Sequence, residues 1–363
     1  MSEWRKVHVD LGAHSYDIHI GHGIEAELEA FVDTAGLSRK ALLITDTNVG
    51  PLYGAHVRSV LESAGLDAAY VEIKAGESAK CLAVAETLYT KAIEAGLDRK
   101  SPIFALGGGV VGDLAGFIAA TYMRGVPFVQ IPTSLLAQVD SSVGGKVAVN
   151  HVLGKNLIGS FYQPKAVFMD LAMLKTLPQR EIYTGLGEIV KYGIICDAAF
   201  FGYLESNQKD VLALAPEAAT HIIARSCEIK ADVVAKDECE SGLRRILNFG
   251  HTIAHAIEKE TGYTRYNHGE AVAIGMIGAA HISRDMGLVP MEEVSRMRAL
   301  IEALHLPTKA EGCTVDAMYA DIFHDKKTVN GKVAWILMEG IGRVVCRNDV
   351  PENTVRSAMQ ACL

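Results

Sequence analysis

The first half of the chain is constrained most strongly by four short apolar runs, each of which stops at a polar or glycine-rich stretch. The runs cover residues 40–45, 69–73, 101–106 and 126–131, with helical periodicity between them. Short apolar runs of this kind are typical of strands that are buried on both faces. Strands that alternate with helices predict a mostly parallel sheet with helices on both of its faces.

Ligands of such sheets bind beyond the carboxyl ends of the strands. Asp46, Gly107–Gly109 and Thr133–Ser134 stand at such ends. Gly107 opens the segment Gly-Gly-Gly-Val-Val-Gly-Asp, which fits G-x-G-x-x-G with an expected strand before it and a helix after it. Glycines let the backbone approach a pyrophosphate, whose charge is favoured at a helix N-terminus.

This glycine motif has two interpretations. It lies far from the first strand–helix unit, and no acidic residue ends a following strand at the usual distance, so a tight turn that serves packing is one of them. Asp46, Glu77 and Lys80 lie near other expected strand ends, where they could hold ribose hydroxyls. We therefore favour a nucleotide site.

Helical periodicity dominates the chain after residue 178, and strand candidates are few. We expect helices over residues 213–234, 247–260, 269–286 and 292–304. A length of 363 residues also predicts two domains, since domains average about 150 residues. The prediction is an N-terminal α/β domain over residues 1–178 and a C-terminal helical domain over residues 179–363.

Composition excludes several classes of protein. Hydrophobic residues make up 49% and charged residues 21% of the chain, as in soluble globular proteins. The formal net charge of −8 argues against a general binder of nucleic acid or of anionic membranes, because such proteins need basic surfaces. No apolar run reaches the length that spans a bilayer.

Cysteine usage indicates the compartment. Seven cysteines without a C-x-x-C pair predict neither a disulfide framework nor a cysteine–zinc module. The opening residues carry no apolar signal region. We therefore expect reduced thiols and a cytoplasmic protein.

A second glycine-rich pattern carries lysines. Lys146 ends the run that starts at Asp140, and Lys155 lies within residues 154–156. The first run lacks the first glycine of G-x-x-x-x-G-K-[ST], and Val147 replaces the Ser or Thr that would bind magnesium, which argues against an ATP-hydrolysing phosphate loop. We predict that both lysines lie on glycine-rich turns and bind an anion. The alternative is a pair of solvated surface lysines.

A polar stripe is expected in the second half. Arg244, Asn248, His251 and His255 are spaced four, three and four residues apart. If residues 244–258 form one helix, these side chains share one face. A single histidine is more often a core or surface residue, but a cation, an amide and two imidazoles in register make a poor core face. The pattern therefore indicates a polar site.

Two of these side chains are candidate metal ligands. Catalytic zinc is often held by two histidines and one carboxylate, with one position left open. One histidine of the stripe, His268 and an acid such as Glu188 or Glu270 would provide that set. Helical spacing also permits His251 and His255 as a pair of ligands four residues apart. The residues alone leave these alternatives open.

Six runs of the chain, among them GEIVKYG and NHGEAVAIGM, resemble the 3-dehydroquinate synthase family, and HDKKT at residues 324–328 extends the match. The runs cover residues 107–125, 132–150, 154–164, 187–193, 247–258 and 267–276. The resemblance implies a Rossmann-like, mostly parallel sheet domain that binds NAD, followed by a helical domain that binds metal and substrate. Sugar-phosphate cyclases and, more distantly, glycerol and iron-type alcohol dehydrogenases share this wider fold.

The resemblance also implies roles for single residues. It places zinc, with cobalt as a second possibility, on Glu188, His251 and His268, which leaves His255 as a catalytic residue that contacts substrate. Further catalytic or substrate-binding positions are Arg124, Asp140, Lys146, Asn156, Lys191, Lys230, Glu240, Arg244, Asn248 and Lys326 or its neighbour Lys327. The implied NAD site consists of Asp46, Asn48, Glu77, Lys80, Gly108, Gly109, Val110, Asp113, Thr133, Ser134, Lys155 and Thr176.

The implied reaction converts 3-deoxy-D-arabino-heptulosonate 7-phosphate to 3-dehydroquinate and phosphate in the shikimate pathway. NAD oxidises carbon 5 transiently, phosphate is eliminated, hydride returns, and the ring opens and closes again by an internal aldol reaction. The resemblance further implies a homodimer in which Arg124 reaches the neighbouring subunit. The alternatives are another sugar-phosphate cyclase that uses NAD and a metal, and a polyol dehydrogenase of related fold.

Overall fold

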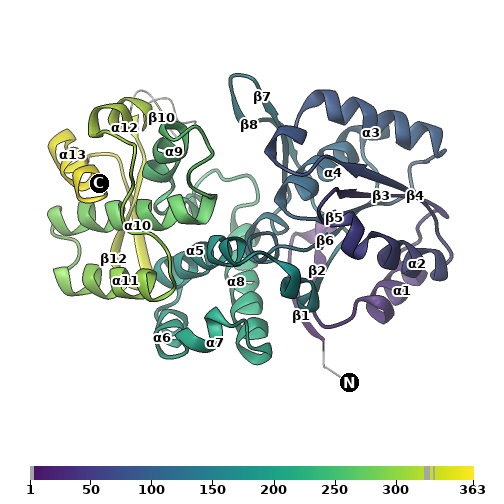
Figure 1. The fold of residues 1–363 in the computed structure, drawn as a ribbon, viewed down its shortest axis with the longest axis horizontal. Coiled ribbons are helices and arrows are strands. Elements are labelled where there is room, and N and C mark those ends of the chain that lie inside the picture. Colours follow the sequence, from purple (N-terminus) through teal and green to yellow (C-terminus); the bar gives the residue numbers. More distant parts are fainter. Residues whose placement is uncertain (1–3, 323–327, 330–331) are drawn as a thin grey trace. The chain divides into compact units, whose positions relative to one another are not determined.

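The chain forms two compact units (Figure 1). The structure is a computed structural model that describes residues 4–322, 328–329 and 332–363. The first unit comprises residues 1–177 and 230–239, and the second comprises residues 178–229 and 240–363. The sequence prediction had assigned residues 230–239 to the second domain, whereas they pack with the first unit.

A seven-stranded sheet forms the centre of the first unit, with the strand order β1-β2-β9-β6-β5-β3-β4. Its strands are β1 (Arg5–Val9), β2 (Tyr16–Gly21), β3 (Lys40–Asp46), β4 (Asp67–Ile73), β5 (Ile103–Gly107), β6 (Phe128–Pro132) and β9 (Ala166–Asp170). Only β1 and β2 pair in antiparallel fashion, and the other neighbours are parallel. The predicted mostly parallel sheet is confirmed. The four apolar runs form β3, β4, β5 and β6.

Helices cover both faces of this sheet, which explains why the apolar runs lack polar alternation. They are α1 (Glu25–Thr34), α2 (Ala55–Ser63), α3 (Leu82–Glu94) and α4 (Gly109–Thr121). Successive residues of a strand point to opposite faces. Leu42 and Ile44 of β3 therefore join the core beneath α3 and α4, whereas Leu43 joins the core beneath α1 and α2.

Strands β7 (Lys146–His151) and β8 (Gly154–Phe161) form an antiparallel hairpin that projects from the first unit (Figure 1). The prediction that Lys146 and Lys155 lie on glycine-rich turns is therefore wrong, because both belong to strands. A glycine in β8 lets the backbones of the two paired strands come close together. A Cβ atom on Gly159 would lie 2.3 Å from the Val147 carbonyl oxygen of the paired strand.

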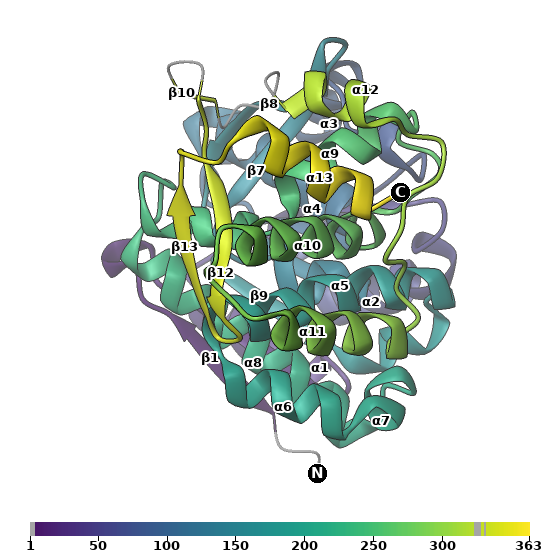
Figure 2. The same ribbon diagram turned by 90° about the vertical axis from the view of Figure 1, so that its left-hand side faces the viewer.

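The second unit is mainly helical. Its helices are α5 (Gln179–Cys196), α6 (Ala198–Ser206), α7 (Gln208–Leu212), α8 (Pro216–Lys236, whose last residues belong to the first unit), α9 (His251–Glu260), α10 (His268–Asp285), α11 (Met291–Ala303), α12 (Val315–Asp321) and α13 (Glu352–Ala361). Helix α10 is buried along almost its whole length and contacts α5, α9, α11 and α13 (Figure 2). Among the described residues, no helix combines the length and apolarity needed to cross a bilayer.

Two features of the second unit differ from the prediction. Strands β12 (Trp335–Gly340) and β13 (Arg343–Arg347) form a hairpin where few strands were expected, and β10 (Thr328–Val329) pairs with β11 (Lys332–Val333). Residues 244–258 are not one helix, because a short 3-10 helix, η7 (Leu243–Asn248), ends before α9 begins. Gly250 adopts a φ of 79° between the two. A Cβ atom there would lie 2.7 Å from the Met276 nitrogen of α10.

Candidate active site

Glu188, His251 and His268 converge in the second unit. Glu188 lies in the middle of α5, and the two histidines are the first residues of α9 and α10. The ligand atoms of the three side chains all lie within 4.8 Å of one another. The Oε1 atom of Glu188 is 3.5 Å from Nε2 of His251 and also 3.5 Å from Nε2 of His268.

This arrangement fits a tetrahedral metal site. Zinc bonds to imidazole nitrogen and carboxylate oxygen measure about 2.0–2.1 Å, so ligand atoms of a tetrahedral site lie about 3.4 Å apart. The two contacts of 3.5 Å to Glu188 match that spacing. Two imidazoles and one carboxylate would leave a fourth position for an oxygen of a substrate or of water.

The second ring nitrogen of each histidine is also engaged. Nδ1 of His251 lies 3.1 Å from the Phe249 carbonyl oxygen, and Nδ1 of His268 lies 3.3 Å from Oε1 of Glu258. A carbonyl oxygen and an ionised carboxylate only accept hydrogen bonds, so each Nδ1 is the donor. In the neutral form of each ring the lone pair therefore resides on Nε2, the atom that faces Glu188.

Charge is concentrated around the three residues. Glu188 is fully buried, and its Oε2 atom accepts a hydrogen bond from the ammonium group of Lys191, one turn later on α5. Burial by itself lowers the pKa of His268, but the carboxylates of Glu188 and Glu258 outweigh that effect and raise the pKa to about 10. The metal-free site therefore favours a cation.

Glycines let α5 and α10 approach each other beside Glu188 and His268. A Cβ atom on Gly269 would lie 1.9 Å from the Thr184 carbonyl oxygen, and one on Gly187 would lie 2.5 Å from the Gly269 carbonyl oxygen. Gly187 directly precedes Glu188, and Gly269 directly follows His268. The backbone contact between the helices therefore holds these two candidate ligands at a fixed separation.

The geometry separates the alternatives for the ligand set. Glu270 belongs to the capping box of α10, where its Oε2 atom accepts from the Asn267 nitrogen at 2.8 Å, and its Oε1 atom accepts from Arg180 Nε at 2.8 Å. The His255 ring centroid lies 5.7 Å from that of His251 and 6.5 Å from that of His268. His255 therefore lies beside the three-residue cluster.

Other predicted residues of the second unit lie on or near η7. Arg244 and Lys191 are each 1% exposed, so both cations are deeply buried. Nδ2 of Asn248 donates to Oε1 of Glu240 at 2.7 Å. Glu240 has a φ of 58°, a strained conformation for a residue with a side chain.

The first unit contains further predicted substrate residues, of which Lys230 and Asp140 are in contact. The ammonium of Lys230 donates to Oδ1 of Asp140 at 2.7 Å and to the Asp140 carbonyl oxygen at 2.5 Å. Asn156 has a φ of 55°, and its backbone nitrogen donates to Oδ1 of Asn150 at 2.9 Å. Arg124 is exposed with a φ of 69°. Lys326 and Lys327 lie outside the described residues.

The glycine motif connects β5 to α4, as expected for a nucleotide-binding turn, and Gly108 is the N-cap of α4. A Cβ atom on Gly108 would lie 3.4 Å from Ser134 Oγ, and one on Gly109 would lie 3.1 Å from Ser141 Oγ. The Thr133 nitrogen donates to the Gly107 carbonyl oxygen at 3.0 Å. The predicted residues of these two strand ends are thus brought together.

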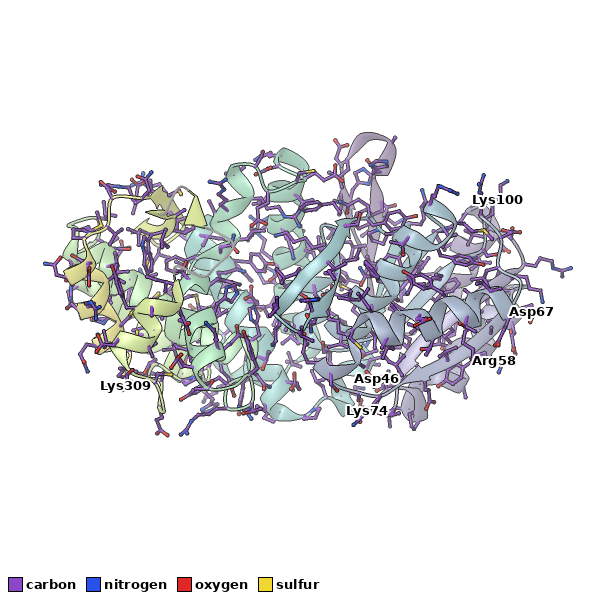
Figure 3. All side chains as sticks on the ribbon, turned by 90° about the horizontal axis from the view of Figure 1, so that it is seen from above. Asp46, Arg58, Asp67, Lys74, Lys100 and Lys309 are labelled. Carbon is purple, nitrogen blue, oxygen red and sulfur yellow. The ribbon has the colours of Figure 1, made fainter. Side chains whose placement is uncertain are left out.

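Asp46 and Asn48 of the predicted NAD set lie at the carboxyl end of β3 or just after it, whereas Lys155 lies in β8. Asp46 accepts hydrogen bonds from the backbone nitrogens of Asn48 and Val49 at 2.8 and 3.0 Å. Figure 3 shows Asp46 and Lys74 at one end of the strands, with Asp67 and Lys100 at the other.

Four side chains complete the predicted NAD set. Lys80 forms an ion pair with Asp113 of α4; burial raises the pKa of Asp113, and Lys80 opposes that shift. Glu77 Oε1 accepts from Asn150 Nδ2 at 2.7 Å, and Thr176 Oγ1 lies 2.7 Å from the Tyr53 hydroxyl oxygen.

One neighbour of the cluster was missed by sequence reasoning. Glu258, which contacts His268, lies three residues after His255 and seven after His251 on α9. Residues at these spacings share a helix face. Continuing the polar stripe of His251 and His255 by one more step would have found it.

Fold and site together define a class of protein, the sugar-phosphate cyclases. A 2-deoxy-scyllo-inosose synthase complexed with carbaglucose-6-phosphate, NAD+ and Co2+ is 25% identical, with 99% of this chain and 100% of that chain covered and a TM-score of 0.88. A 2-epi-5-epi-valiolone synthase from Streptomyces hygroscopicus with NAD+ and Zn2+ bound is 29% identical, with 96% of each chain covered and a TM-score of 0.88.

Within this class, the chain belongs to the 3-dehydroquinate synthase family. Family models described as the 3-dehydroquinate synthase N-terminal and C-terminal parts match residues 70–184 and 185–328. A 3-dehydroquinate synthase from Desulforamulus reducens is 49% identical over 354 residues, which cover 97% of this chain and 99% of that protein.

Proposed function

We propose that this chain converts 3-deoxy-D-arabino-heptulosonate 7-phosphate to 3-dehydroquinate and inorganic phosphate. The convergence of Glu188, His251 and His268 within 4.8 Å is the observation that carries the proposal. Relatives that are 49% identical over nearly the whole chain bear the name of this activity. The reaction breaks a carbon–oxygen bond to release phosphate. An oxidation of the substrate precedes this step and a reduction follows it, so there is no net redox change.

The proposed cofactors are NAD and Zn2+. Bound NAD would take hydride from carbon 5 and return it, and Zn2+ would polarise the oxygen on that carbon. Solved relatives with 25% and 29% identity hold NAD+ with Co2+ or Zn2+. The donor set of two imidazoles and one carboxylate supports zinc. Glu188, His251 and His268 would hold the ion.

NAD binding is assigned to the first unit. The glycine turn at Gly108 and Gly109 would let the α4 N-terminus approach the pyrophosphate, since glycines put no side chain between the backbone and the ligand. A side chain on Gly109 would also crowd Ser141. Asp46, Glu77 and Lys80 would hold ribose hydroxyls. The other proposed contacts are Asn48, Val110, Asp113, Thr133, Ser134, Lys155 and Thr176.

Cationic side chains would bind the two anionic groups of the substrate. The chain has a net charge of −8, so a carboxylate and a phosphate need local compensation. Lys191, Lys230 and Arg244 are almost completely buried, and the first two are oriented by Glu188 and Asp140. Arginine suits a forked contact with either anion. Lys146, Asn156, Asn248, Arg124 and Lys326 are the further proposed contacts.

His255 and Glu240 would accept and return the proton of the substrate alcohol. The His255 ring lies next to the cluster, with its centroid 5.7 Å from that of His251. A histidine exchanges protons near neutral pH. Asn248 donates to Glu240, which fixes the direction of this carboxylate.

We further propose a homodimer in the cytoplasm. All seven cysteines carry free thiols, which suits a reducing compartment. Arg124 is exposed on a loop where both it and Met123 have positive φ, so the loop presents the guanidinium outward. The family resemblance assigns this arginine to the neighbouring subunit.

The decisive experiment incubates the full chain with the heptulosonate phosphate, Zn2+ and NAD in an amount far below that of the substrate. We expect one phosphate and one 3-dehydroquinate, identified by mass, for each substrate consumed, with no accumulation of NADH. His251→Ala should lose bound zinc and turnover together. Stoichiometric NADH without phosphate release would instead identify a polyol dehydrogenase and overturn the proposal.

A related cyclase activity is the second candidate, because both structural relatives with TM-scores of 0.88 are synthases of other carbocycles. Incubating the chain with several hexose and heptulose phosphates separates the candidates. We expect a carbocyclic product only from the heptulosonate phosphate. Efficient formation of an inosose or a valiolone would favour the second candidate.

A further inference from the structure

The two histidines of the metal cluster are supported by different chemistry. His251 donates from Nδ1 to a neutral backbone carbonyl, that of Phe249, at 3.1 Å. His268 faces the carboxylate of Glu258, whose Oε1 atom lies 3.3 Å from Nδ1. A carboxylate holds an imidazole proton more strongly than a carbonyl does, because the contact is assisted by charge.

Glu258 is well placed for this contact. It lies seven residues after His251 on α9, so both side chains emerge on the same face of the helix. Only 8% of Glu258 is exposed, and a buried carboxylate is costly unless it is paired. The Tyr263 nitrogen donates to the Glu258 carbonyl oxygen at 2.7 Å, which holds the end of α9 in place.

Helix α9 thus contributes to the position of both proposed histidine ligands. It provides His251 directly, and through Glu258 it reaches the first residue of α10, His268. On its other side α10 is held against α5 by Gly269, whose missing side chain leaves space for the Thr184 carbonyl oxygen. His268 is therefore constrained by its own backbone on one side and by Glu258 on the other.

We propose that Glu258 is a positioning residue for the metal centre, an inference that rests on the metal site of the proposed function. Its carboxylate keeps the proton on Nδ1 of His268, so the Nε2 lone pair faces the site. Its negative charge makes that nitrogen a stronger donor and offsets part of the charge of the ion. Outer carboxylates of this kind change metal affinity by about 10–100-fold.

The test titrates the metal-free full chain with Zn2+ against a competing chelator, without NAD or sugar phosphate. Glu258→Gln keeps an acceptor oxygen and removes the charge, and Glu258→Ala removes both. We expect the zinc dissociation constant to be about 10-fold larger than native in Glu258→Gln and about 100-fold larger in Glu258→Ala. The visible absorption of bound Co2+ should change in the same order.

Glu260→Gln is the matched control. Glu260 lies two residues later on the same helix, is exposed, and interacts with Asp321 instead of the cluster. Its replacement should leave the zinc dissociation constant within about twofold of native, since the charge lies outside the contact to His268. If Glu258→Ala fails to fold, Glu258→Gln carries the test alone.

Three outcomes decide the inference. Native zinc affinity in both Glu258 variants would overturn it, and so would equal losses in Glu258→Gln and Glu260→Gln. A chain that forms no 3-dehydroquinate but loses zinc affinity in the Glu258 variants would overturn the proposed function and support this inference. The two proposals therefore fail separately.

Discussion

His251 and His268 show how one hydrogen bond decides which nitrogen of a histidine is available. Both rings engage Nδ1 and turn Nε2 toward one oxygen of Glu188, although they begin different helices. Each ring has two nitrogens of similar basicity, so the polar atom beside Nδ1 settles the choice. The geometry of the cluster is thus prepared before any ion binds.

Lys191 and Glu188 form a buried ion pair, and its contribution to the unfolding free energy should depend on whether a metal ion is bound. Their side chains are 2% and 0% exposed. Removing one partner of a buried pair costs about 3–5 kcal/mol, because the other charge is left uncompensated. We expect Lys191→Met to lower the unfolding free energy by this amount in metal-free protein and by less with Zn2+, whose charge would compensate Glu188. Urea unfolding with and without Zn2+ measures both values.

Lys40→Met is the control for that prediction. Its pair with Asp67 is exposed, with side chains 50% and 68% accessible. Exposed pairs contribute at most about 1 kcal/mol, so this variant should be nearly neutral in both conditions. Equal destabilisation of Lys191→Met with and without Zn2+ would show that the ion does not reach Glu188.

We expect His281 to make the unfolding free energy of the chain depend on pH. It is 8% exposed, and its Nε2 atom lies 3.3 Å from Arg298 Nη2. Burial lowers the pKa of His281, Arg284 and Arg298 lower it further, and Asp285 opposes them. Below about pH 6.5 the unfolded chain binds this proton before the folded chain does, so stability falls as the pH falls.

The variant His281→Gln isolates this contribution, because glutamine does not titrate. We expect the native chain to lose more unfolding free energy than the variant between pH 7.5 and pH 5.5. Urea unfolding at the two pH values gives the difference. Identical losses in the two proteins would mean that His281 is protonated equally in the folded and unfolded states.

The close contact between helices α5 and α10 should affect both stability and zinc affinity. A Cβ atom on Gly269 would lie 1.9 Å from the Thr184 carbonyl oxygen, so Gly269→Ala must push the two helices apart. We expect a loss of about 3 kcal/mol or more in unfolding free energy, at the upper end of overpacking effects. Zinc affinity should fall too, because Glu188 and His268 adjoin this contact.

Gly202→Ala on α6 is the matched control for that substitution. In the part of the chain that the structure describes, no atom beyond its own stretch of α6 lies within 4 Å of its added Cβ. Alanine also favours a helix interior over glycine by about 0.5–1 kcal/mol. We expect this variant to be at least as stable as the native chain. Denaturant unfolding and zinc titration of both variants test the argument, and native zinc affinity in Gly269→Ala would contradict it.

Each compact unit carries one group of side chains that we propose to bind a cofactor. The metal cluster draws on α5, α9 and α10 of the second unit, and the glycine turn on β5, β6 and α4 of the first. A ligand that binds only the folded state at 100 times its dissociation constant stabilises that state by about 2.7 kcal/mol. Each ligand should therefore stabilise its own unit first.

Hydrogen exchange can separate these two effects. We expect Zn2+ to slow amide exchange in α5, α9 and α10, and NAD to slow it at the carboxyl ends of β3, β5 and β6 and in α4. Measurements with each ligand alone, followed by both, give the pattern. Slower exchange from Zn2+ confined to the strands of the first unit would contradict the assignment of the metal to Glu188, His251 and His268.

The sequence by itself determined the elements whose signal is local. The runs that became β3, β4, β5 and β6 are apolar because the sheet is covered on both faces, and the glycine motif marks the turn after β5. Family-specific runs around Glu188, His251 and His268 also predicted these three residues as metal ligands. These features depend on residues that are neighbours in the chain.

Only the tertiary structure decided which distant residues meet. The break at Gly250, the Glu258 contact to His268 and the β12–β13 hairpin depend on what packs against them, above all on α10. Residue type alone offered Glu188 and Glu270 as alternatives, and the crossing of α5 and α10 places Glu188, not Glu270, beside His251 and His268. Local periodicity cannot encode such contacts, because they depend on which separate elements pack against one another.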